Sequence, residues 1–283
     1  MSSFGYISPQ TLEETIAVLG DHPESRLVAG GNDVLLPINH SRLIGSLLVD
    51  LRRVSALRGI ERQTDGSVRV GAMTSIGAIA SSALLRAEFP ALAQAAELVG
   101  DAQVRNRATL GGSIAANDPE ADLPAPLLAL DASIEFLGSR GRWRVRASEF
   151  FRESAARPHD EIIVSVVLPR PPEHAGMAYV KFKHPARLYA LCGVATVLGT
   201  VNGQIDTVRI AVTGAANRPF RFKGIEDALL NRPATAQTVN AASSSVFPEL
   251  DFRGDIFAST EYRSHLTAVL TRRALEQALA HPA

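Results

Sequence analysis

The sequence contains a single cysteine, Cys192, and this scarcity excludes whole classes of site. One thiol cannot form a disulfide, a C-x-x-C zinc site or a cysteine-ligated iron–sulfur cluster within the chain. Because Cys192 stands in the apolar run ALCGVATVL, we interpret it as a small buried thiol rather than a reactive one. The seven histidines show no H-x-H or H-E-x-x-H spacing, so we expect neither a metal site nor a Ser–His–Asp triad.

The sequence also lacks an excess of either charge, and it lacks long hydrophobic runs. Its 29 basic and 29 acidic residues cancel, which argues against binding to nucleic acid or to a membrane surface. No apolar run approaches the ~20 residues that a bilayer-spanning helix needs. The start, MSSFGYISPQ, lacks the charged and apolar segments of a secretory signal, so the cytoplasm is the expected compartment.

The length of 283 residues predicts about two domains, and the patterns along the first half predict mixed helix and strand. Thr11 and Glu14 fit a capping box for a helix that Gly20 is expected to end. Apolar periodicity predicts strands at 46–51, 65–73 and 161–169, a hairpin at 132–146, and helical structure over 74–99 interrupted at Pro90.

Three prolines and a glycine within residues 169–176 predict a linker, and the sequence pattern changes after it. Asn202-Gly203 separates two alternating runs, which is a strong signal for a β-hairpin. Helical patterns follow at 224–231, 235–245 and 259–280. These features predict an α+β protein, with a mixed N-terminal part followed by antiparallel strands and then helices.

Two pairs of adjacent glycines stand out, in LVAGGND (27–33) and TLGGS (109–113). If each pair leaves a strand, consecutive N–H groups can form a nest for phosphate oxygens, and two nests can grip a diphosphate from both sides. A tight turn is the plain alternative for either pair. Because neither G-x-G-x-x-G nor G-x-x-x-x-G-K-[ST] occurs, a bound dinucleotide would not lie on a Rossmann or P-loop scaffold.

Three acids, Asp118, Glu120 and Asp122, follow the second glycine pair closely. They could form a divalent-cation site, but no further ligand joins them at loop spacing. A solvated acidic turn around Pro119 is the plain alternative. A third interpretation is that one acid, preferably Asp122, accepts hydrogen bonds from a ligand hydroxyl or ring N–H.

Arg140, Arg142, Arg144 and Arg146 recur at a spacing of two, so on a strand they share one face. A solvated sheet edge, which resists edge-to-edge aggregation, is the favoured interpretation, and a patch that docks an acidic partner is the alternative. Trp143 is interpreted as a packing residue.

Three strings together resemble the FAD-binding medium subunits of the molybdenum hydroxylases: LVAGGNDVLLPI, VRNRATLGGSIAANDPEADLPAPLLALDA and YVKFK…LCGVATVL. That family includes the flavin subunits of carbon monoxide dehydrogenase and the flavin domain of xanthine dehydrogenase. The similarity runs from about Tyr6 to Val212. It implies a vanillyl-alcohol-oxidase-type FAD-binding fold of two α/β subdomains, 1–57 and 58–175, followed by a C-terminal domain, 176–283.

The resemblance also implies positions that contact FAD and implies no catalytic side chain and no metal ligand in this chain. Asn32 departs from the Thr or Ser usual in the family, and Leu188 stands where the family carries Asp. A strand-edge lysine is the plain alternative for Lys183, and Tyr189 would lie near the flavin only if its strand faces the cleft. The implied contacts are Leu27, Val28, Ala29, Gly30, Gly31, Asn32, Asp33, Val34, Val99, Thr109, Leu110, Gly111, Gly112, Ser113, Asp122, Ile163 and Lys183.

In function, the resemblance implies an electron-transfer subunit with non-covalent FAD. Molybdopterin would lie on a large partner subunit and [2Fe–2S] clusters on a small one, in a dimer of heterotrimers. The flavin would pass electrons to NAD, a quinone or oxygen. Two rivals remain: a self-sufficient FAD-dependent oxidoreductase of the same fold, and a non-enzymatic nucleotide-binding or assembly module.

Overall fold

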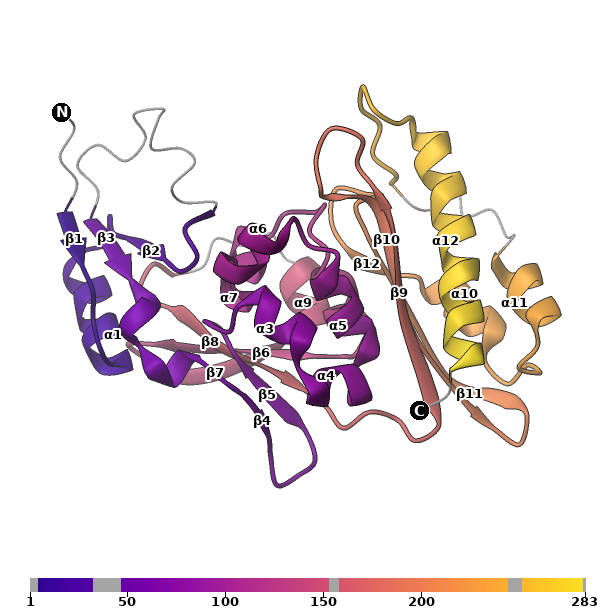
Figure 1. Cartoon of the computed structure of the whole chain (residues 1–283), viewed down its shortest axis with the longest axis horizontal. Coiled ribbons are helices and arrows are strands. Elements are labelled where there is room, and N and C mark those ends of the chain that lie inside the picture. Colours follow the sequence, from indigo (N-terminus) through magenta and orange to yellow (C-terminus); the bar gives the residue numbers. More distant parts are fainter. Residues whose placement is uncertain (1–4, 33–46, 153–157, 244–250, 282–283) are drawn as a thin grey trace.

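The computed structural model describes residues 5–32, 47–152, 158–243 and 251–281. Three sheets follow one another along the long axis of the molecule, in the order of the sequence (Figure 1). Helices cover the central sheet and fill the space between it and the C-terminal sheet. This α+β architecture confirms the predicted fold class.

The first sheet is small and parallel. Its strands β1 (Gly5–Ile7), β3 (Leu47–Asp50) and β2 (Arg26–Val28) lie in the order β1-β3-β2. Helix α1 (Leu12–Asp21) packs beside them, and the Thr11 hydroxyl accepts a hydrogen bond from the Glu14 N–H at 3.1 Å, as the capping box predicts. The prediction that Gly20 ends α1 was wrong. A methyl group at Gly20 would meet nothing within 4 Å, so the residue is an exposed part of the last turn.

The central sheet is antiparallel and has five strands in the order β4-β5-β8-β6-β7. The predicted hairpin is present, with the edge strand β7 bearing exposed arginines. Trp143 of β7 stacks on Phe136 with ring centroids 4.5 Å apart, which confirms its packing role. The strands are β4 (Ile60–Arg62), β5 (Val68–Gly71), β6 (Ser133–Gly138), β7 (Gly141–Arg146) and β8 (Ile162–Leu168).

Short helices cover one face of the central sheet and share its core. Pro90 begins a helix, as its fixed φ and missing N–H favour, and so divides the predicted helical region. Two 3-10 turns, η2 (Leu51–Arg53) and η3 (Ser55–Leu57), join the first sheet to the second. The helices are α3 (Ile76–Ser81), α4 (Ala83–Glu88), α5 (Pro90–Glu97), α6 (Ala102–Arg107), α7 (Leu110–Ala116), α8 (Pro124–Ala129) and α9 (Ala147–Arg152).

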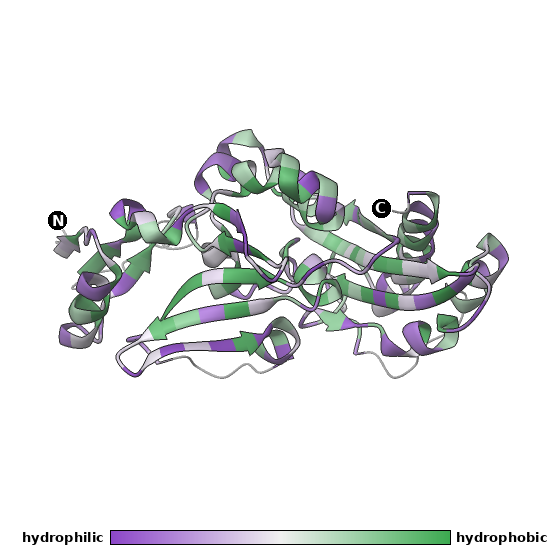
Figure 2. Ribbon diagram, turned by 90° about the horizontal axis from the view of Figure 1, so that it is seen from below, coloured by the Kyte–Doolittle hydropathy of each residue, from purple (hydrophilic) through white to green (hydrophobic). Residues whose placement is uncertain are grey.

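The C-terminal sheet is antiparallel, in the order β12-β11-β10-β9, and both of its faces are covered. One face packs on α12, and α5 and α8 approach the other. Hydrophobic residues run along its long strands and those of the central sheet (Figure 2). The elements are β9 (Ala175–Lys183), β10 (Ala190–Val201), β11 (Gln204–Thr213), β12 (Phe220–Arg221), α10 (Lys223–Leu229), α11 (Ala236–Ser243) and α12 (Thr260–Ala280).

Two sequence predictions for this part are confirmed in detail. Asn202 and Gly203 turn β10 into β11 with φ angles of 51° and 76°, the positive values of a tight hairpin turn. Cys192 is fully buried, its sulfur lies 3.4 Å from the Thr267 hydroxyl, and burial raises the pKa of the thiol to about 12. No helix in the described residues is long and apolar enough to cross a membrane.

Candidate functional site

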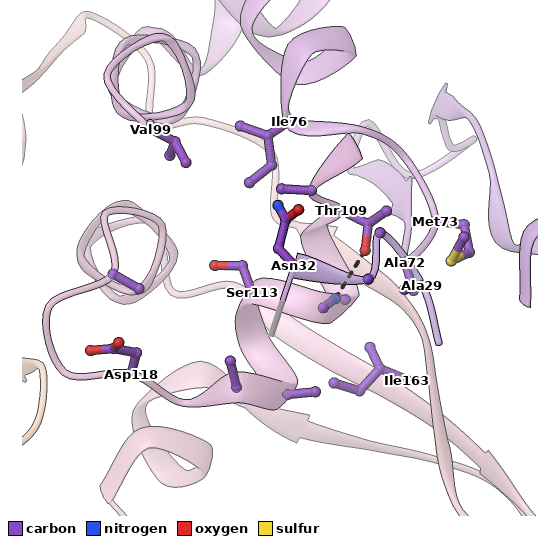
Figure 3. A pocket seen from close by; sticks show the side chains of 18 of the residues that line it. Ala29, Asn32, Ala72, Met73, Ile76, Val99, Thr109, Ser113, Asp118 and Ile163 are labelled. Atoms are coloured by element: carbon purple, nitrogen blue, oxygen red, sulfur yellow. Dashed lines mark hydrogen bonds between the residues drawn. The ribbon is translucent and has the colours of Figure 1, made fainter. Parts of the chain in front are cut away.

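A cavity of about 770 Å³ lies where the first sheet, the helices and the central sheet meet. The loop after β2, the start of α7, strand β8 and the loop before β10 all contribute to its wall. Asn32 and Ser113 project toward its middle, with Val99 and Ile76 on one side and Ile163 on the opposite side (Figure 3). Most of the wall is apolar, which suits a ligand with flat ring systems.

The first glycine pair forms a turn that leaves β2 and enters the cavity wall. A side chain at Gly30 would meet the Arg107 carbonyl oxygen at 2.1 Å, so this backbone contact admits only glycine. Gly31 has φ of 85°, in the left-handed region that favours glycine. The N–H groups of Gly30, Gly31 and Asn32 make no hydrogen bond to another described residue. Within the described part of the chain, this loop therefore has three consecutive unpaired donors, as a nest requires.

The second glycine pair does not leave a strand, and this corrects the sequence prediction. Thr109 is the N-cap of α7, and its hydroxyl accepts a hydrogen bond from the Gly112 N–H at 3.1 Å. The Gly111 N–H donates to the Ala72 carbonyl oxygen at 2.8 Å. The Leu110 and Ser113 N–H groups are also bonded within the protein. No free N–H nest exists here.

The two glycines of α7 differ from each other. A side chain at Gly111 would lie 2.7 Å from the Ala72 Cβ, so this residue is needed for protein packing. At Gly112 the nearest atoms would be the Thr109 hydroxyl oxygen at 2.9 Å and the Ala29 Cβ at 3.9 Å, with no backbone close by. Gly112 therefore leaves space on the cavity side of the helix, and the Thr109 and Ser113 hydroxyls supply the polar groups there.

The acidic segment is largely buried, which corrects the alternative of a solvated turn. Glu120 is paired with Arg187 and Arg253, each at 3.2 Å. Asp118 lines the cavity, and its carboxylate accepts a hydrogen bond from the Glu120 N–H at 2.8 Å. No cluster of three or more metal-ligating side chains occurs in the described ranges.

Asp122 borders the cavity, but protein groups already occupy its carboxylate. The Tyr179 hydroxyl donates to Oδ1 at 2.6 Å, and the Lys181 ammonium donates to Oδ2 at 2.7 Å. Burial raises the pKa of Asp122, while the nearby Lys181 acts to lower it. Burial likewise raises the pKa of Tyr179 well above its ordinary value, because the phenolate would be desolvated beside a carboxylate.

The structure brings most of the predicted contact positions together at this cavity. Val28 and Leu110 are buried beside the wall without lining it, and Lys183 is exposed at the end of β9. Asp33 and Val34 lie outside the described residues. The positions that line it are Leu27, Ala29, Gly30, Gly31, Asn32, Val99, Thr109, Gly111, Gly112, Ser113, Asp122 and Ile163.

Sequence reasoning missed much of the wall. These residues are mainly small or apolar, they sit in ordinary helices and strands, and no spacing signals them. Leu188 and Tyr189, in the loop before β10, do face the cavity. The missed residues include Leu51, Ala72, Met73, Ile76, Gly100, Val104, Ala115, Ala116, Phe136, Phe150 and Ile162.

Cations lie beside this cavity rather than in it. Within the described part of the chain, no lysine or arginine lines the large cavity. A smaller cavity of about 210 Å³ shares Ala29, Gly30 and Thr109 with it and is lined by Arg52, Arg58 and Arg107. Among the described residues, an anion in the large cavity would therefore meet N–H groups and hydroxyls rather than a cationic side chain.

Comparison with known protein families shows which family this chain belongs to. The family described as the FAD binding domain in molybdopterin dehydrogenase matches residues 2–171. The carbon monoxide dehydrogenase flavoprotein C-terminal domain matches residues 177–278. The chain belongs to the FAD-binding medium subunits of the molybdenum hydroxylases. Both matches together cover almost its whole length, in the order that the sheets follow.

Similar medium subunits are found in several bacteria. The xanthine dehydrogenase FAD-binding subunit of Escherichia coli O157:H7 is 33% identical over 97% of this chain and 96% of its own length. The carbon monoxide dehydrogenase medium chain of Hydrogenophaga pseudoflava is 34% identical over 98% and 97%. The nicotine 6-hydroxylase medium subunit of Paenarthrobacter nicotinovorans is 35% identical over 96% of each.

Solved structures show the same fold. A chain of carbon monoxide dehydrogenase from Hydrogenophaga pseudoflava, in a form that lacks the Mo-pyranopterin moiety, superposes with a TM-score of 0.91 and 32% identity, covering 99% of this medium subunit and 98% of that chain. A chain of quinoline 2-oxidoreductase from Pseudomonas putida 86 gives a TM-score of 0.90 at 30% identity, covering 98% and 97%.

Proposed function

We propose that this medium subunit binds one FAD non-covalently in the 770 Å³ cavity and transfers electrons between a partner's iron–sulfur clusters and an external acceptor. The observation that carries the proposal is the meeting of both glycine segments at one cavity wall. The volume lies within the range of about 300–1,000 Å³ that is usual for small-molecule sites. When bound, the flavin supplies the redox chemistry, and the protein supplies binding and orientation.

The residues of the cavity fit the two chemical parts of FAD. The N–H groups of Gly30, Gly31 and Asn32, which have no partner among the described residues, suit a diphosphate. The hydroxyls of Thr109 and Ser113 face the same space. Apolar side chains suit the adenine and isoalloxazine rings. We propose that the sequence-predicted contact set holds the cofactor. Within that set, Gly111 contributes by allowing α7 to pack closely against Ala72. Asp122 contributes by holding the cavity wall through its bonds to Tyr179 and Lys181.

No cysteine or histidine lines the cavity among the described residues, which supports non-covalent binding. We also propose that the three sheets correspond to two FAD-binding subdomains, 1–57 and 58–175, and a C-terminal domain, 176–283. The cytoplasm is the proposed compartment.

The proposed partners are a small [2Fe–2S] subunit and a large molybdopterin subunit, arranged as a dimer of heterotrimers. The chain's single buried cysteine cannot ligate a cluster, so the electrons must come from another polypeptide. The relatives named as medium chains and medium subunits support this arrangement. The acceptor is proposed to be NAD, a quinone or oxygen.

Purification of the native complex tests this proposal. An affinity-tagged copy expressed in the native host should co-purify with a small cysteine-rich subunit and a large molybdenum subunit. The isolated medium subunit should reduce an artificial dye at most and should hydroxylate nothing. Hydroxylation of an aromatic or aldehyde substrate by the recombinant chain alone would instead establish a self-sufficient oxidoreductase.

A further inference from the structure

Lys181 of β9 has a fully buried side chain, and neither the glycine segments nor the proposed FAD contacts explain why a lysine is buried there. Its side chain is 0% exposed. The ammonium donates to the Asp122 carboxylate at 2.7 Å, to the Leu188 carbonyl oxygen at 2.7 Å and to the Leu98 carbonyl oxygen at 3.1 Å. A lysine has three N–H donors, so all of them are used.

The three acceptors belong to three separate segments of the cavity wall. Leu98 ends α5 and is followed by Val99 and Gly100, which line the cavity. Asp122 lines it directly. Leu188 and its neighbour Tyr189 line it from the loop before β10. One ammonium group therefore connects wall segments that are far apart in the sequence.

The loop before β10 is also tied to the acidic segment, because Arg187 pairs with Glu120 at 3.2 Å and the Ala190 N–H donates to the Glu120 carbonyl oxygen at 3.1 Å. Leu188 is 48% exposed and Tyr189 is 36% exposed, so the body of the protein covers this loop only in part. The loop is closed by a hydrogen bond from the His184 N–H to the Tyr189 carbonyl oxygen at 3.0 Å. Lys181 adds the hydrogen bond that holds the Leu188 carbonyl oxygen itself.

We propose that Lys181 is a positioning residue of the flavin site: its ammonium sets the spacing of the 98–100, 121–122 and 188–189 segments around the cofactor. The inference rests on the proposed binding of FAD. Lys181 itself touches no cofactor in this account. Its effect on the flavin is transmitted by the residues it holds, Val99 on one side and Tyr189 on another.

A simpler role for Lys181 would be to neutralise buried Asp122. Truncating the lysine alone would leave that carboxylate buried without a counter-charge, so any loss of FAD could reflect a damaged fold. The double variant Lys181→Met/Asp122→Asn separates the two roles. It leaves no unpaired charge, and the amide oxygen of Asn can still accept from Tyr179, yet the bonds to Leu98 and Leu188 are absent.

The test compares the full-length wild type, Lys181→Met, the double variant and Lys223→Met, a control that removes an exposed lysine of α10 that does not line the cavity. FAD affinity is measured by titrating the apoprotein and following flavin fluorescence. Amide hydrogen exchange reports on segments 98–100 and 184–189, and thermal melting reports on stability. If Lys181→Met does not fold, the double variant carries the test.

For the double variant we expect native circular dichroism, an FAD dissociation constant raised about tenfold, as when a supporting contact of a site is removed, and faster exchange in both segments. Lys223→Met should match the wild type. Wild-type affinity and exchange in the double variant would overturn the proposal and leave charge neutralisation as the role. If the wild type itself binds no FAD, the proposed function fails, whereas the exchange data still decide whether Lys181 holds the wall.

Discussion

The two glycine segments have the same Gly-Gly pair and line the same cavity, but the glycines have different structural roles in them. In the first, Gly31 has a positive φ and three consecutive N–H groups have no partner among the described residues. In the second, the pair lies in the first turn of α7, and the N–H groups of Gly111 and Gly112 are bonded within the protein. The first segment can donate to a ligand through its backbone, whereas the second provides close packing, open space and hydroxyls.

The difference shows that two adjacent glycines mark a place where there is no room for a side chain, and that they can adopt different backbone conformations there. At Gly30 and Gly111 the neighbouring protein occupies the space that a side chain would fill. At Gly112 the near neighbour is a side-chain oxygen, the Thr109 hydroxyl at 2.9 Å, and the space beyond it borders the cavity. Substitutions at these positions should therefore separate into effects on folding and effects on FAD binding.

The largest effect is expected for Gly111→Val. Its Cβ would lie 2.7 Å from the Ala72 Cβ and 3.0 Å from the Ala72 carbonyl oxygen, so the backbone must move. Overpacking of this kind costs typically about 1–3 kcal/mol of stability, and a branched side chain adds to it. Thermal melting should show a strong loss of stability together with loss of FAD. A melting temperature equal to that of the wild type would contradict the packing role.

Gly112→Val should instead remove FAD binding while far-UV circular dichroism stays native, because the added side chain enters cofactor space. The matched control is Gly20→Ala in α1, where a Cβ meets nothing within 4 Å. Gly138 is unsuitable as a control because its Cβ would lie 2.7 Å from the Glu161 Cγ. Normal flavin content in purified Gly112→Val would show that the cofactor does not approach α7.

Gly31→Ala tests the first segment. A residue with a Cβ at φ of 85° is strained by roughly 1–2 kcal/mol, and relief of that strain would turn the N–H groups away from the cavity. We expect weaker FAD affinity by fluorescence titration and a small fall in melting temperature. If the melting temperature falls but FAD affinity does not change, the N–H groups of this loop are not donors to the cofactor.

Thr109→Ala should have a smaller effect, because one hydroxyl is lost. The cap of α7 is worth about 1 kcal/mol, and Ser82→Ala, at the N-cap of α4, removes an equivalent cap away from the cavity. Both variants should melt at similarly reduced temperatures, but only Thr109→Ala should bind FAD more weakly. Equal FAD affinity in the two variants would leave Thr109 with a capping role alone.

The smallest effect is expected at Cys192. Because burial raises the pKa of its thiol to about 12, the reactive thiolate is scarce at pH 8. Iodoacetamide should leave the folded protein unlabelled and should label it once in denaturant. Rapid labelling of the native protein would show that this part of the C-terminal sheet opens readily.

Much of the fold could be predicted from the sequence, because its signals are local. Short stretches of sequence are enough to recognise three of its features: the Asn202-Gly203 turn, the proline at the start of α5, and the alternation in β6 and β7. The error at Gly20 arose because an exposed helical glycine costs little and need not end a helix. The prediction of a strand before Gly111 was wrong because Thr109 caps a helix there, and its hydroxyl bonds the Gly112 N–H.

The site was predictable only where special residue types mark it. Glycine pairs, Thr109 and Asp122 are recognisable in sequence, whereas Ala72, Phe136 and Ile162 reach the cavity through tertiary packing alone. Lys181 and Lys183 look alike in the string KFK, yet β9 buries the former and exposes the latter. The two lysines share one face of β9, and Lys183 stands at the last residue of the strand, so burial depends on what packs over each position, which the sequence of the strand does not reveal.

The identity and amount of released flavin test the central claim most directly. The purified chain is denatured with acid and centrifuged, and the supernatant is analysed by chromatography and absorbance. We expect one FAD per chain in the supernatant. Colour that stays in the pellet, release of FMN, or a colourless protein that takes up no added FAD would contradict a non-covalent FAD site in this cavity.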